Sequence, residues 1–444
     1  MMLSRRSLLA AAAAAPLLAG PAAAQQPVEI QFWHAMGGAL NEWVDELAKG
    51  FNDSQKAYKV VAVNKGNYTE VMTGGIAAYR AGKAPHIIQV FEVGTATMMA
   101  AKGAVKPVYE VMEQAGIGWD PKVYLPAVAG YYTTTDGRML SMPLNSSSPI
   151  FYYNKDAFKK AGLDPAVPPK TWVEVREAAK KLQAAGIPCG ISTAWPSWVL
   201  IENFGAMHNL PMGTLENGFG GLATQFQFNS PAHVTHLERI AEMQKAKEFD
   251  YGGRRGDSQV KFTNAECGMY IQSSAGLSSI LKTAKFDVGF GMMPYWPDLT
   301  KGPNGGPQNS ILGGATLWVL GGKSANEYKG VAEFFAYISK PDVQAASHQR
   351  TGYLPITMAA YELTKKQGFY EKNPGFEIAN KQMTLNPPTS NSKGIRFGNL
   401  VQARDIIEEE MEAVFAGKKP AKAALDSAVQ RGNALLRQFE RDNK

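Results

Sequence analysis

Side chains that could bind a polar ligand follow three segments that read as β-strands. They are the pair Trp33-His34, Tyr68 after a short turn, and Glu92. An ionised carboxylate accepts hydrogen bonds from hydroxyl groups, and a tyrosine hydroxyl can donate one. Ligands of open α/β sheets bind outside the carboxyl ends of the strands. The three segments therefore indicate a binding site, although Glu92 could equally be a salt-bridged strand end and His34 reads as a structural residue.

Motifs of the common enzyme classes are incomplete. Gly322-Lys323-Ser324 resembles the end of a phosphate-binding P-loop, but that pattern requires glycine where Leu317 stands. His233, His236 and nearby Glu238 could form a metal site, although their spacing is more typical of a polar helix face. The chain has no HExxH or GxSxG motif and no identifiable pair of catalytic carboxylates. We therefore expect binding without chemical change, with a secreted phosphodiesterase or glycosidase as the enzyme alternative.

The elements that position these residues alternate between strands and helices. Strands are predicted over Val28–Trp33, Tyr58–Val63 and Ile87–Val90, and helices over Asn41–Lys49 and from beyond Tyr68 to about Arg80. This alternation predicts an α/β sheet with parallel strands.

A second α/β region starts near Ser146. Its apolar run Ile150–Tyr153 predicts a buried strand, and Thr171 with Glu174 forms a capping box that begins a helix ending before Gly186. Further elements are a strand at Val288–Met293, a Pro/Gly-rich crossing at Pro294–Pro307, a strand at Ile311–Leu320 broken by Gly313-Gly314, a helix capped by Ser324 and Glu327, a helix at 341–351 and helical chain from Val401 onward.

The first residues are typical of an export signal. Arg5-Arg6 precedes an Ala/Leu-rich stretch that Pro16, Gly20 and Pro21 interrupt, so the stretch does not read as a membrane span. The sequence SRRSLL predicts a twin-arginine signal over residues 1–24, with an ordinary secretory signal as the alternative. We therefore expect a soluble protein in the periplasm.

Composition limits the classes of partner. The 444 residues are 45% hydrophobic and 19% charged, with a net charge of +7. The basic residues are scattered, so the chain lacks the clustered stripe of a nucleic-acid-binding protein, while the mild positive field suits a small anion. Two cysteines, Cys189 and Cys267, are too few for a disulfide-built scaffold. They could pair after export or remain as buried free thiols.

Several short motifs, taken together and in order, resemble one family. They are KGNY (65–68), FEVGTATMMA (91–100), NSSSP (145–149), YYNKDAFKKAGLDP (152–165), WPSW (195–198), GGATLWV (313–319), TGYLPIT (351–357) and GFYEKNPG (368–375). Over essentially the whole mature chain they are similar to the bacterial extracellular solute-binding proteins, the periplasmic receptors of ABC importers.

The resemblance implies a type II periplasmic binding protein fold. This fold has two α/β lobes joined by hinge strands, and each lobe is a mostly parallel sheet flanked by helices. Lobe 1 would comprise residues 25–145 and 294–340, and lobe 2 would comprise residues 146–293 and 341–444.

The resemblance also implies a ligand shell in the cleft between the lobes. Its members are Tyr68, Glu92, Ser147, Trp195, Trp198, Ser273, Gly314, Tyr353 and Arg404. Tyr68, Glu92 and Gly314 would come from the first lobe and the others from the second. Because the serines run together, Ser146 and Ser274 are adjacent alternatives. Pro196 and Met207-His208 depart from the family pattern, which predicts a different alcohol substituent at that end of the cleft.

The implied ligand is a small anion, sn-glycerol-3-phosphate or a glycerophosphodiester. Its phosphate would bind the Arg404 guanidinium and the backbone N–H of Gly314, because a guanidinium fork is the strongest single donor and glycine permits close approach. The hydroxyls of Ser147, Ser273 and Tyr353 would complete the donor set. The alternatives are a solvated arginine and a β-bulge at the glycine.

The other end of the ligand would be a polyol. Glu92 would accept hydrogen bonds from the glycerol hydroxyls and, because it repels phosphate, should lie at the end of the cleft opposite Arg404. Trp195 and Trp198 would form apolar walls, although paired tryptophans can also plug a core.

The implied partners are this ligand and the transmembrane subunits of an ABC permease. We expect a monomer with no metal or cofactor, and the scattered basic residues argue against a nucleic-acid partner. A sugar-binding receptor of the same fold is the alternative within the family.

Overall fold

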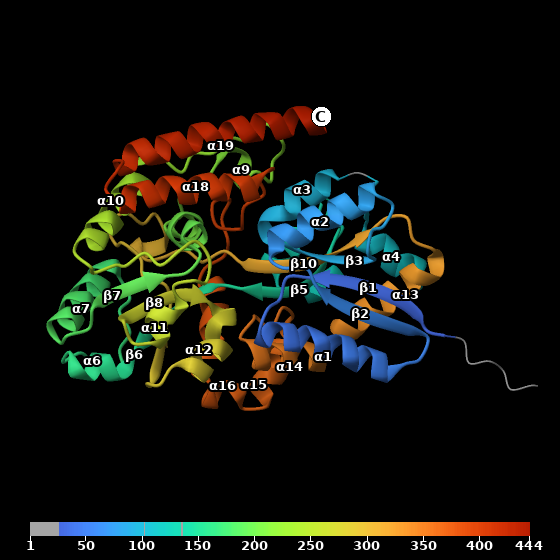
Figure 1. The fold of residues 1–444 in the computed structure, drawn as a ribbon, viewed down its shortest axis with the longest axis horizontal. Coiled ribbons are helices and arrows are strands. Elements are labelled where there is room, and N and C mark those ends of the chain that lie inside the picture. The colour runs from blue at the N-terminus through green and yellow to red at the C-terminus, as the bar shows by residue number, and fades with distance from the viewer. Residues whose placement is uncertain (1–25, 102, 135) are drawn as a thin grey trace, which may run out of the picture.

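Two β-sheets lie side by side in a computed structural model, which describes residues 26–101, 103–134 and 136–444 (Figure 1). The export signal predicted over residues 1–24 falls outside the described residues. No helix in the described ranges is long and apolar enough to cross a bilayer.

The first sheet contains the three strands predicted near the N-terminus. Its strand order is β2-β1-β3-β10-β4, with β5 also paired to β10. The strands are β1 Val28–His34, β2 Tyr58–Asn64, β3 Ile87–Phe91, β4 Val105–Lys106, β5 Met142–Ser147 and β10 Gly313–Leu320. β1 runs parallel to β2 and β3, whereas β10 runs antiparallel to β3, β4 and β5.

The second sheet has the strand order β7-β8-β6-β9. Its strands are β6 Pro149–Asn154, β7 Cys189–Thr193, β8 Cys267–Ser273 and β9 Val288–Gly291. Only the β7–β8 pair is parallel within it. In each sheet one strand, β10 in the first and β6 in the second, runs against the others, which share one direction, so the predicted mostly parallel sheets are confirmed. β5, β6, β9 and β10 adjoin the two crossings between the sheets, and each of them pairs antiparallel with its neighbours.

Helices flank both sheets. Their bounds are α1 Ala39–Ser54, α2 Tyr68–Arg80, α3 Thr95–Ala100, α4 Val108–Gln114, α5 Pro126–Tyr132, α6 Lys155–Lys160, α7 Trp172–Ala184, α8 Phe204–Met207, α9 Thr214–Asn217, α10 Pro231–Lys245, α11 Gln259–Thr263, α12 Leu277–Thr283, α13 Ala325–Ile338, α14 Pro341–Thr351, α15 Met358–Lys366, α16 Phe369–Lys372, α17 Ile378–Met383, α18 Leu400–Phe415 and α19 Ala421–Asn443. Shorter turns are η1 Glu92–Gly94, η2 Pro121–Val123, the π-helical η3 Trp198–Asn203, η4 Ser274–Gly276, η5 Pro303–Gly305 and η6 Pro374–Glu377.

Local capping signals set several helix starts as predicted. Thr171 with Glu174 and Ser324 with Glu327 form reciprocal capping boxes at α7 and α13. The predicted end of the first helix near Lys49 is wrong. α1 continues to Ser54 because Phe51, in the following turn, packs into the core against Phe334 with ring centroids 5.4 Å apart.

The chain crosses from the first sheet to the second at Ser148, between β5 and β6. It returns along residues 292–312, which lead into β10. α14 packs beside α1, where Trp43 Nε1 donates to Ser347 Oγ at 2.9 Å. The lobe boundaries at 145/146, 293/294 and 340/341 stay a prediction.

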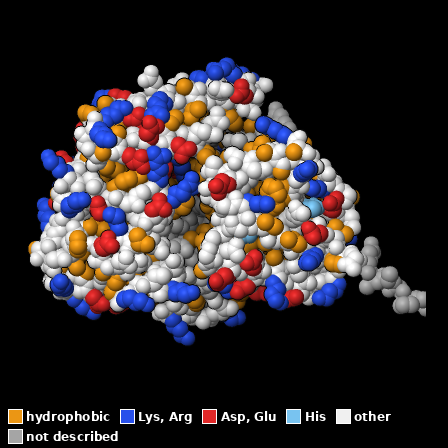
Figure 2. All heavy atoms as spheres, viewed as in Figure 1, with side chains coloured by type: hydrophobic (Ala, Val, Ile, Leu, Met, Phe, Trp, Pro, Cys, Tyr) orange, Lys and Arg blue, Asp and Glu red, His pale blue; other side chains and the backbone are white. Residues whose placement is uncertain are grey.

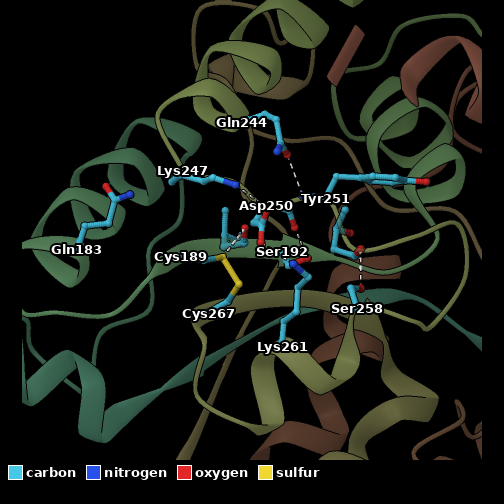
Figure 3. The surroundings of a disulfide bond; sticks show 12 residues. Gln183, Cys189, Ser192, Gln244, Lys247, Asp250, Tyr251, Ser258, Lys261 and Cys267 are labelled. Atoms are coloured by element: carbon cyan, nitrogen blue, oxygen red, sulfur yellow. Dashed lines mark hydrogen bonds and ion pairs between the residues drawn. A yellow bond between two sulfur atoms is a disulfide. The ribbon is translucent and has the colours of Figure 1, made fainter. Parts of the chain in front are cut away.

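Cys189 and Cys267 form a disulfide, which decides between the two states left open by the sequence (Figure 3). They are directly paired residues at the starts of the parallel strands β7 and β8, with Cα atoms 4.4 Å apart. The disulfide thus ties together the ends of these strands that lie away from Thr193 and Ser273.

Candidate functional site

Arg404 is the centre of a buried ion cluster. From α18, its Nη2 donates to Glu92 Oε1 at 2.7 Å. Its Nε and Nη2 donate to Glu202 Oε1 and Oε2, each at 2.6 Å. The side chains of Arg404, Glu92 and Glu202 are 9%, 6% and 0% exposed. Because Glu92 follows β3 of the first sheet and Glu202 lies in η3 after β7 of the second, the cluster joins the two parts of the molecule.

The prediction that Glu92 lies at the opposite end of the site from Arg404 is wrong. A buried guanidinium needs carboxylate partners, and Glu92 is one of the two that it has. Burial raises the pKa of the Glu92 carboxyl above its usual value, although Arg404 opposes this rise. Burial lowers the pKa of Arg404, but Glu202 and Glu92 outweigh that effect and raise it, so the guanidinium stays charged.

Gly314 lies beside this cluster. Its backbone N–H donates to Glu92 Oε2 at 3.2 Å, so Glu92 accepts a hydrogen bond from each of the two groups predicted to bind phosphate. Gly314 has φ of 116°, and a Cβ here would lie 2.1 Å from Asn145 O. Only glycine fits at this position. The β-bulge lies one residue further on, between Ala315 and Thr316.

Two predicted tyrosines carry neutral hydroxyl groups in the same region. The ring of Tyr68, the first residue of α2, stacks on Phe91 with centroids 5.1 Å apart. Asn145 Nδ2 donates to Tyr68 Oη at 3.2 Å, and Gln89 Nε2 donates to Asn145 Oδ1 at 2.9 Å. Burial, followed by the neighbouring Tyr353, raises the pKa of Tyr68 well above its usual value. Burial raises the pKa of Tyr353 to about 12. Both phenols therefore keep their protons at neutral pH.

Ser147 is buried at the end of β5, where it pairs with Gly313. It therefore belongs to a strand of the first sheet, and the prediction that it comes from the second lobe is wrong. The β5–β10 ladder extends further than the sequence indicated. The neighbouring Ser146 pairs with Gly314, and its buried Oγ has no hydrogen-bond partner among the described residues.

Ser273 ends β8, and its Oγ accepts the backbone N–H of Ala275 at 3.2 Å. The buried Oγ of Ser274, like that of Ser146, has no partner within the described part of the chain. Ser274 N donates to Ser148 O at 2.9 Å, so the two serine runs meet at the crossing between the sheets. Tyr353 adjoins them, because Leu354 N donates to Ser146 O at 2.7 Å. The structure thus brings together the predicted hydroxyl donors and their adjacent alternatives.

The two tryptophans flank the crossing from the second part. Trp198 begins η3, and its indole packs so closely on β10 that a Cβ at Gly313 would lie 2.6 Å from Cζ2. Its buried Nε1 has no partner among the described residues. Trp195 has φ of 46° and donates its backbone N–H to Arg255 O at 2.9 Å. The Arg255 guanidinium lies over the Trp195 ring, 5.8 Å from its centroid.

Glu202 and Asn145 were missed by sequence reasoning. Glu202 lies in the apolar run Trp198–Phe204, and a lone carboxylate in such a run requires a buried cation or donor. That signal could have identified Glu202 as a partner for an arginine. Asn145 had no comparable signal, because its contacts with Gln89 and Tyr68 depend on the packing of β3, β5 and α2.

The histidine motif has a different role from the polar helix face predicted for it. His233 and His236 lie on the buried side of α10, where the His236 ring stacks on Phe204 at 3.9 Å. His236 Nδ1 accepts Trp296 Nε1 at 2.9 Å, and His208 Nε2 accepts Trp296 N at 2.9 Å. His208 thus fixes the returning crossing. No group of three His, Cys, Asp or Glu side chains suited to a metal occurs in residues 26–101, 103–134 and 136–444.

The surface between the two halves is hollowed. Figure 2 shows this hollow near the centre of the face, with acidic and basic side chains on its border. In Figure 1 the same region lies between the elements of the first sheet and those of the second.

Comparison with known proteins shows the family to which the chain belongs. A model described as bacterial extracellular solute-binding protein matches residues 46–378. The chain is 54% identical over 424 residues to the sn-glycerol-3-phosphate-binding periplasmic protein UgpB of Pectobacterium atrosepticum, covering 95% of this chain and 94% of that protein. It is 53% identical over 417 residues to the protein of the same name from Yersinia pseudotuberculosis, covering 94% of each.

Solved structures confirm the predicted two-lobed receptor fold. UgpB from Mycobacterium tuberculosis in complex with glycerophosphocholine superposes with a TM-score of 0.76 at 21% identity, over 93% of this chain and 99% of that chain. Maltose-bound T. maritima MalE3 gives a TM-score of 0.74 at 18% identity, over 92% and 100%. At these identities the likeness concerns the fold alone. The two proteins hold different ligands, glycerophosphocholine and maltose.

Proposed function

The chain belongs to the bacterial extracellular solute-binding proteins, and on this premise we propose that it is the periplasmic substrate-binding component of an ABC importer. Its ligand is sn-glycerol-3-phosphate or a glycerophosphodiester. Relatives at 54% and 53% identity, aligned over nearly their whole length, bear the name of sn-glycerol-3-phosphate-binding proteins, which supports this ligand class.

The observation that carries the proposal is the side-by-side placement of two kinds of polar group. One is the charged cluster of Arg404, Glu92 and Glu202. The other is a set of hydroxyls from Tyr68, Ser146, Ser147, Ser273, Ser274 and Tyr353. Two of these hydroxyls, Ser146 Oγ and Ser274 Oγ, are buried without a partner in the described residues, which is costly unless something supplies the missing hydrogen bonds, as a ligand oxyanion would.

The ligand is oriented with its glycerol end toward the charged cluster. Two carboxylates and one guanidinium leave that cluster without spare positive charge, so an adjacent phosphate would be repelled. A hydroxyl group can donate to Glu92 and accept from Arg404, and it therefore suits this end. This orientation replaces the assignment of Arg404 to the phosphate.

The phosphate lies on the neutral donors. Hydroxyls of protonated tyrosines and of serines donate to oxyanion oxygens without introducing a charge that must itself be neutralised. Trp195 and Trp198 line the apolar carbons of the ligand, and Gly314 lets the backbone approach. The proposed ligand-binding residues are thus Tyr68, Glu92, Ser147, Trp195, Trp198, Ser273, Gly314, Tyr353 and Arg404.

Binding favours a closed arrangement of two lobes, divided as residues 25–145 with 294–340 and 146–293 with 341–444, except that Ser146 and Ser147 stay with β5 on the first side. The ligand acts by its greater affinity for the closed state, which a membrane permease then recognises. The protein acts as a monomer, and it releases the ligand chemically unchanged. Export uses the signal proposed for residues 1–24.

Calorimetric titration with sn-glycerol-3-phosphate, glycerophosphocholine and maltose tests the function. We expect micromolar binding, about −8 kcal/mol, for at least one of the two phosphate compounds and none for maltose. Mass spectrometry of the recovered ligand should show no product. Maltose binding without phosphate binding would identify a sugar receptor, and a hydrolysis product would identify an enzyme. Either result would overturn the proposal.

A further inference from the structure

Glu202 and Arg404 form a bidentate ion pair. Its two carboxylate oxygens accept from Nε and Nη2, each at 2.6 Å, and its side chain is fully buried. Two parallel bonds between a carboxylate and a guanidinium fix the plane of the guanidinium as well as its position. The direction in which Arg404 presents its remaining N–H groups therefore depends on Glu202.

The turn that carries Glu202 is itself held in place. In η3, Asn203 Nδ2 donates to Trp198 O at 3.1 Å. Asn203 Oδ1 accepts the backbone N–H of Ile311, just before β10, at 3.0 Å. Glu202 thus stands between Trp198 and a residue that joins η3 to the returning crossing.

The ion pair with Glu202 determines which N–H groups of Arg404 remain for other partners. Nε and one bond of Nη2 go to Glu202, and the second bond of Nη2 reaches Glu92 at 2.7 Å. Nη1 makes no hydrogen bond within the described residues, which leaves its two N–H groups for a ligand. Without its two bonds to Glu202, the guanidinium could rotate. It would then lose both the bond from Nη2 to Glu92 and the fixed orientation of Nη1.

We propose that Glu202 is a positioning residue of the ligand site: it orients Arg404 so that Nη2 meets Glu92 and Nη1 meets the bound polyol. The ligand part of this inference rests on the proposed function, whereas the orientation of Arg404 does not. If Glu202 served only to neutralise the charge of Arg404, a carboxylate in any nearby geometry would do equally well. The positioning role requires the bidentate geometry.

The orientation is tested without ligand by NMR of the arginine side chains. The Nε–H of Arg404, identified by its absence in Arg404→Lys, should exchange slowly with solvent. Glu202→Gln should shift this resonance and speed its exchange, and Glu202→Asp should restore part of the protection. Glu410→Gln is the matched control, because Glu410 is a buried carboxylate on the same helix that accepts from Ser427 Oγ at 2.7 Å. It should leave the resonance unchanged.

Ligand binding supplies the second measurement, with sn-glycerol-3-phosphate as the probe. Glu202→Gln should weaken binding about tenfold in the wild-type background and have little effect in the Arg404→Lys background, because the residue acts through the fork. An unchanged Nε–H resonance in Glu202→Gln, or an equal loss of affinity in both backgrounds, would overturn the inference. Because the resonance is read without ligand, it decides the orientation even if the wild-type protein does not bind the probe.

Discussion

Arg404 Nη2 and Glu92 Oε1 lie 2.7 Å apart although 312 positions separate these residues in the sequence. One follows a strand of the first sheet and the other lies on a helix beside the second, so their contact joins the two parts of the molecule. Glu202 completes the cluster from the same side as Arg404. We propose that the glycerol end of the ligand meets this pair.

Arg404→Ala should impair both binding and stability. Loss of its charge-assisted hydrogen bonds should weaken sn-glycerol-3-phosphate binding about ten- to hundredfold in calorimetry. Two buried carboxylates would lose their cation, so the free energy of unfolding in urea should fall by about 3–5 kcal/mol. Arg254→Ala is the control, since Arg254 bonds Glu412 of the same helix at the edge of the fold. Unchanged affinity in Arg404→Ala would reject its assignment to the site.

Removing the serine hydroxyls should separate ligand binding from stability. Ser146 and Ser274 have buried Oγ atoms without partners, so changing either to Ala breaks no hydrogen bond in the unliganded protein and should leave the melting temperature unchanged or slightly higher. If the serine contacts the phosphate, its change to Ala should weaken the binding of sn-glycerol-3-phosphate about three- to tenfold.

Parallel titrations of Ser146→Ala, Ser147→Ala, Ser273→Ala and Ser274→Ala will establish which serine of each run contacts the ligand. If all four variants bind sn-glycerol-3-phosphate as tightly as the unchanged protein, the phosphate does not lie on these donors.

Glu408 should make stability depend on pH. Burial raises the pKa of its carboxyl from 4.5 to about 7, so the folded protein binds more protons than the unfolded chain between these values. Stability should therefore fall as pH rises from about 4.5 to 7, by up to about 3 kcal/mol. Glu408→Gln should remove this slope in urea titrations between pH 4.5 and 8, and Glu409→Gln, at an exposed position, should retain it. A slope that persists unchanged in Glu408→Gln would assign it to other groups.

The disulfide should stabilise the fold without affecting ligand binding. Cys189 and Cys267 close a loop with a sequence separation of 78. When both become Ala, the free energy of unfolding should fall by about 2–4 kcal/mol. Both cysteines start their strands, β7 and β8, whereas Thr193 and Ser273 at the other ends of these strands lead into the candidate site. Unfolding and calorimetry on the double variant check both points. A marked change in affinity would show that the strand ends are coupled.

Much of the fold could be predicted from the sequence because its signals are local. The capping boxes at Thr171 and Ser324 fix helix starts through residues three positions apart. The apolar run at Ile150–Tyr153 forms the buried strand β6. The insertion of the reversed strand β10 beside β3 and β5 is not a local property, since β10 reaches them only after the chain has passed through the second sheet.

The sequence predicted which residues belong to the candidate site better than it predicted how they are arranged. Motif resemblance identified Glu92 and Arg404, but their contact depends on the packing of distant elements, and the sequence argument placed them at opposite ends. Glu202 had only the weak signal of a carboxylate within an apolar run. The pairing of the two cysteines likewise required the register of β7 on β8.

A crystal structure of the protein with sn-glycerol-3-phosphate tests the proposed ligand orientation most directly. It should place the phosphate oxygens within hydrogen-bonding distance of the tyrosine and serine hydroxyls, and the glycerol hydroxyls against Glu92 and Arg404. A phosphate bound to the Arg404 guanidinium, or a ligand bound outside the crevice between the two sheets, would contradict this orientation.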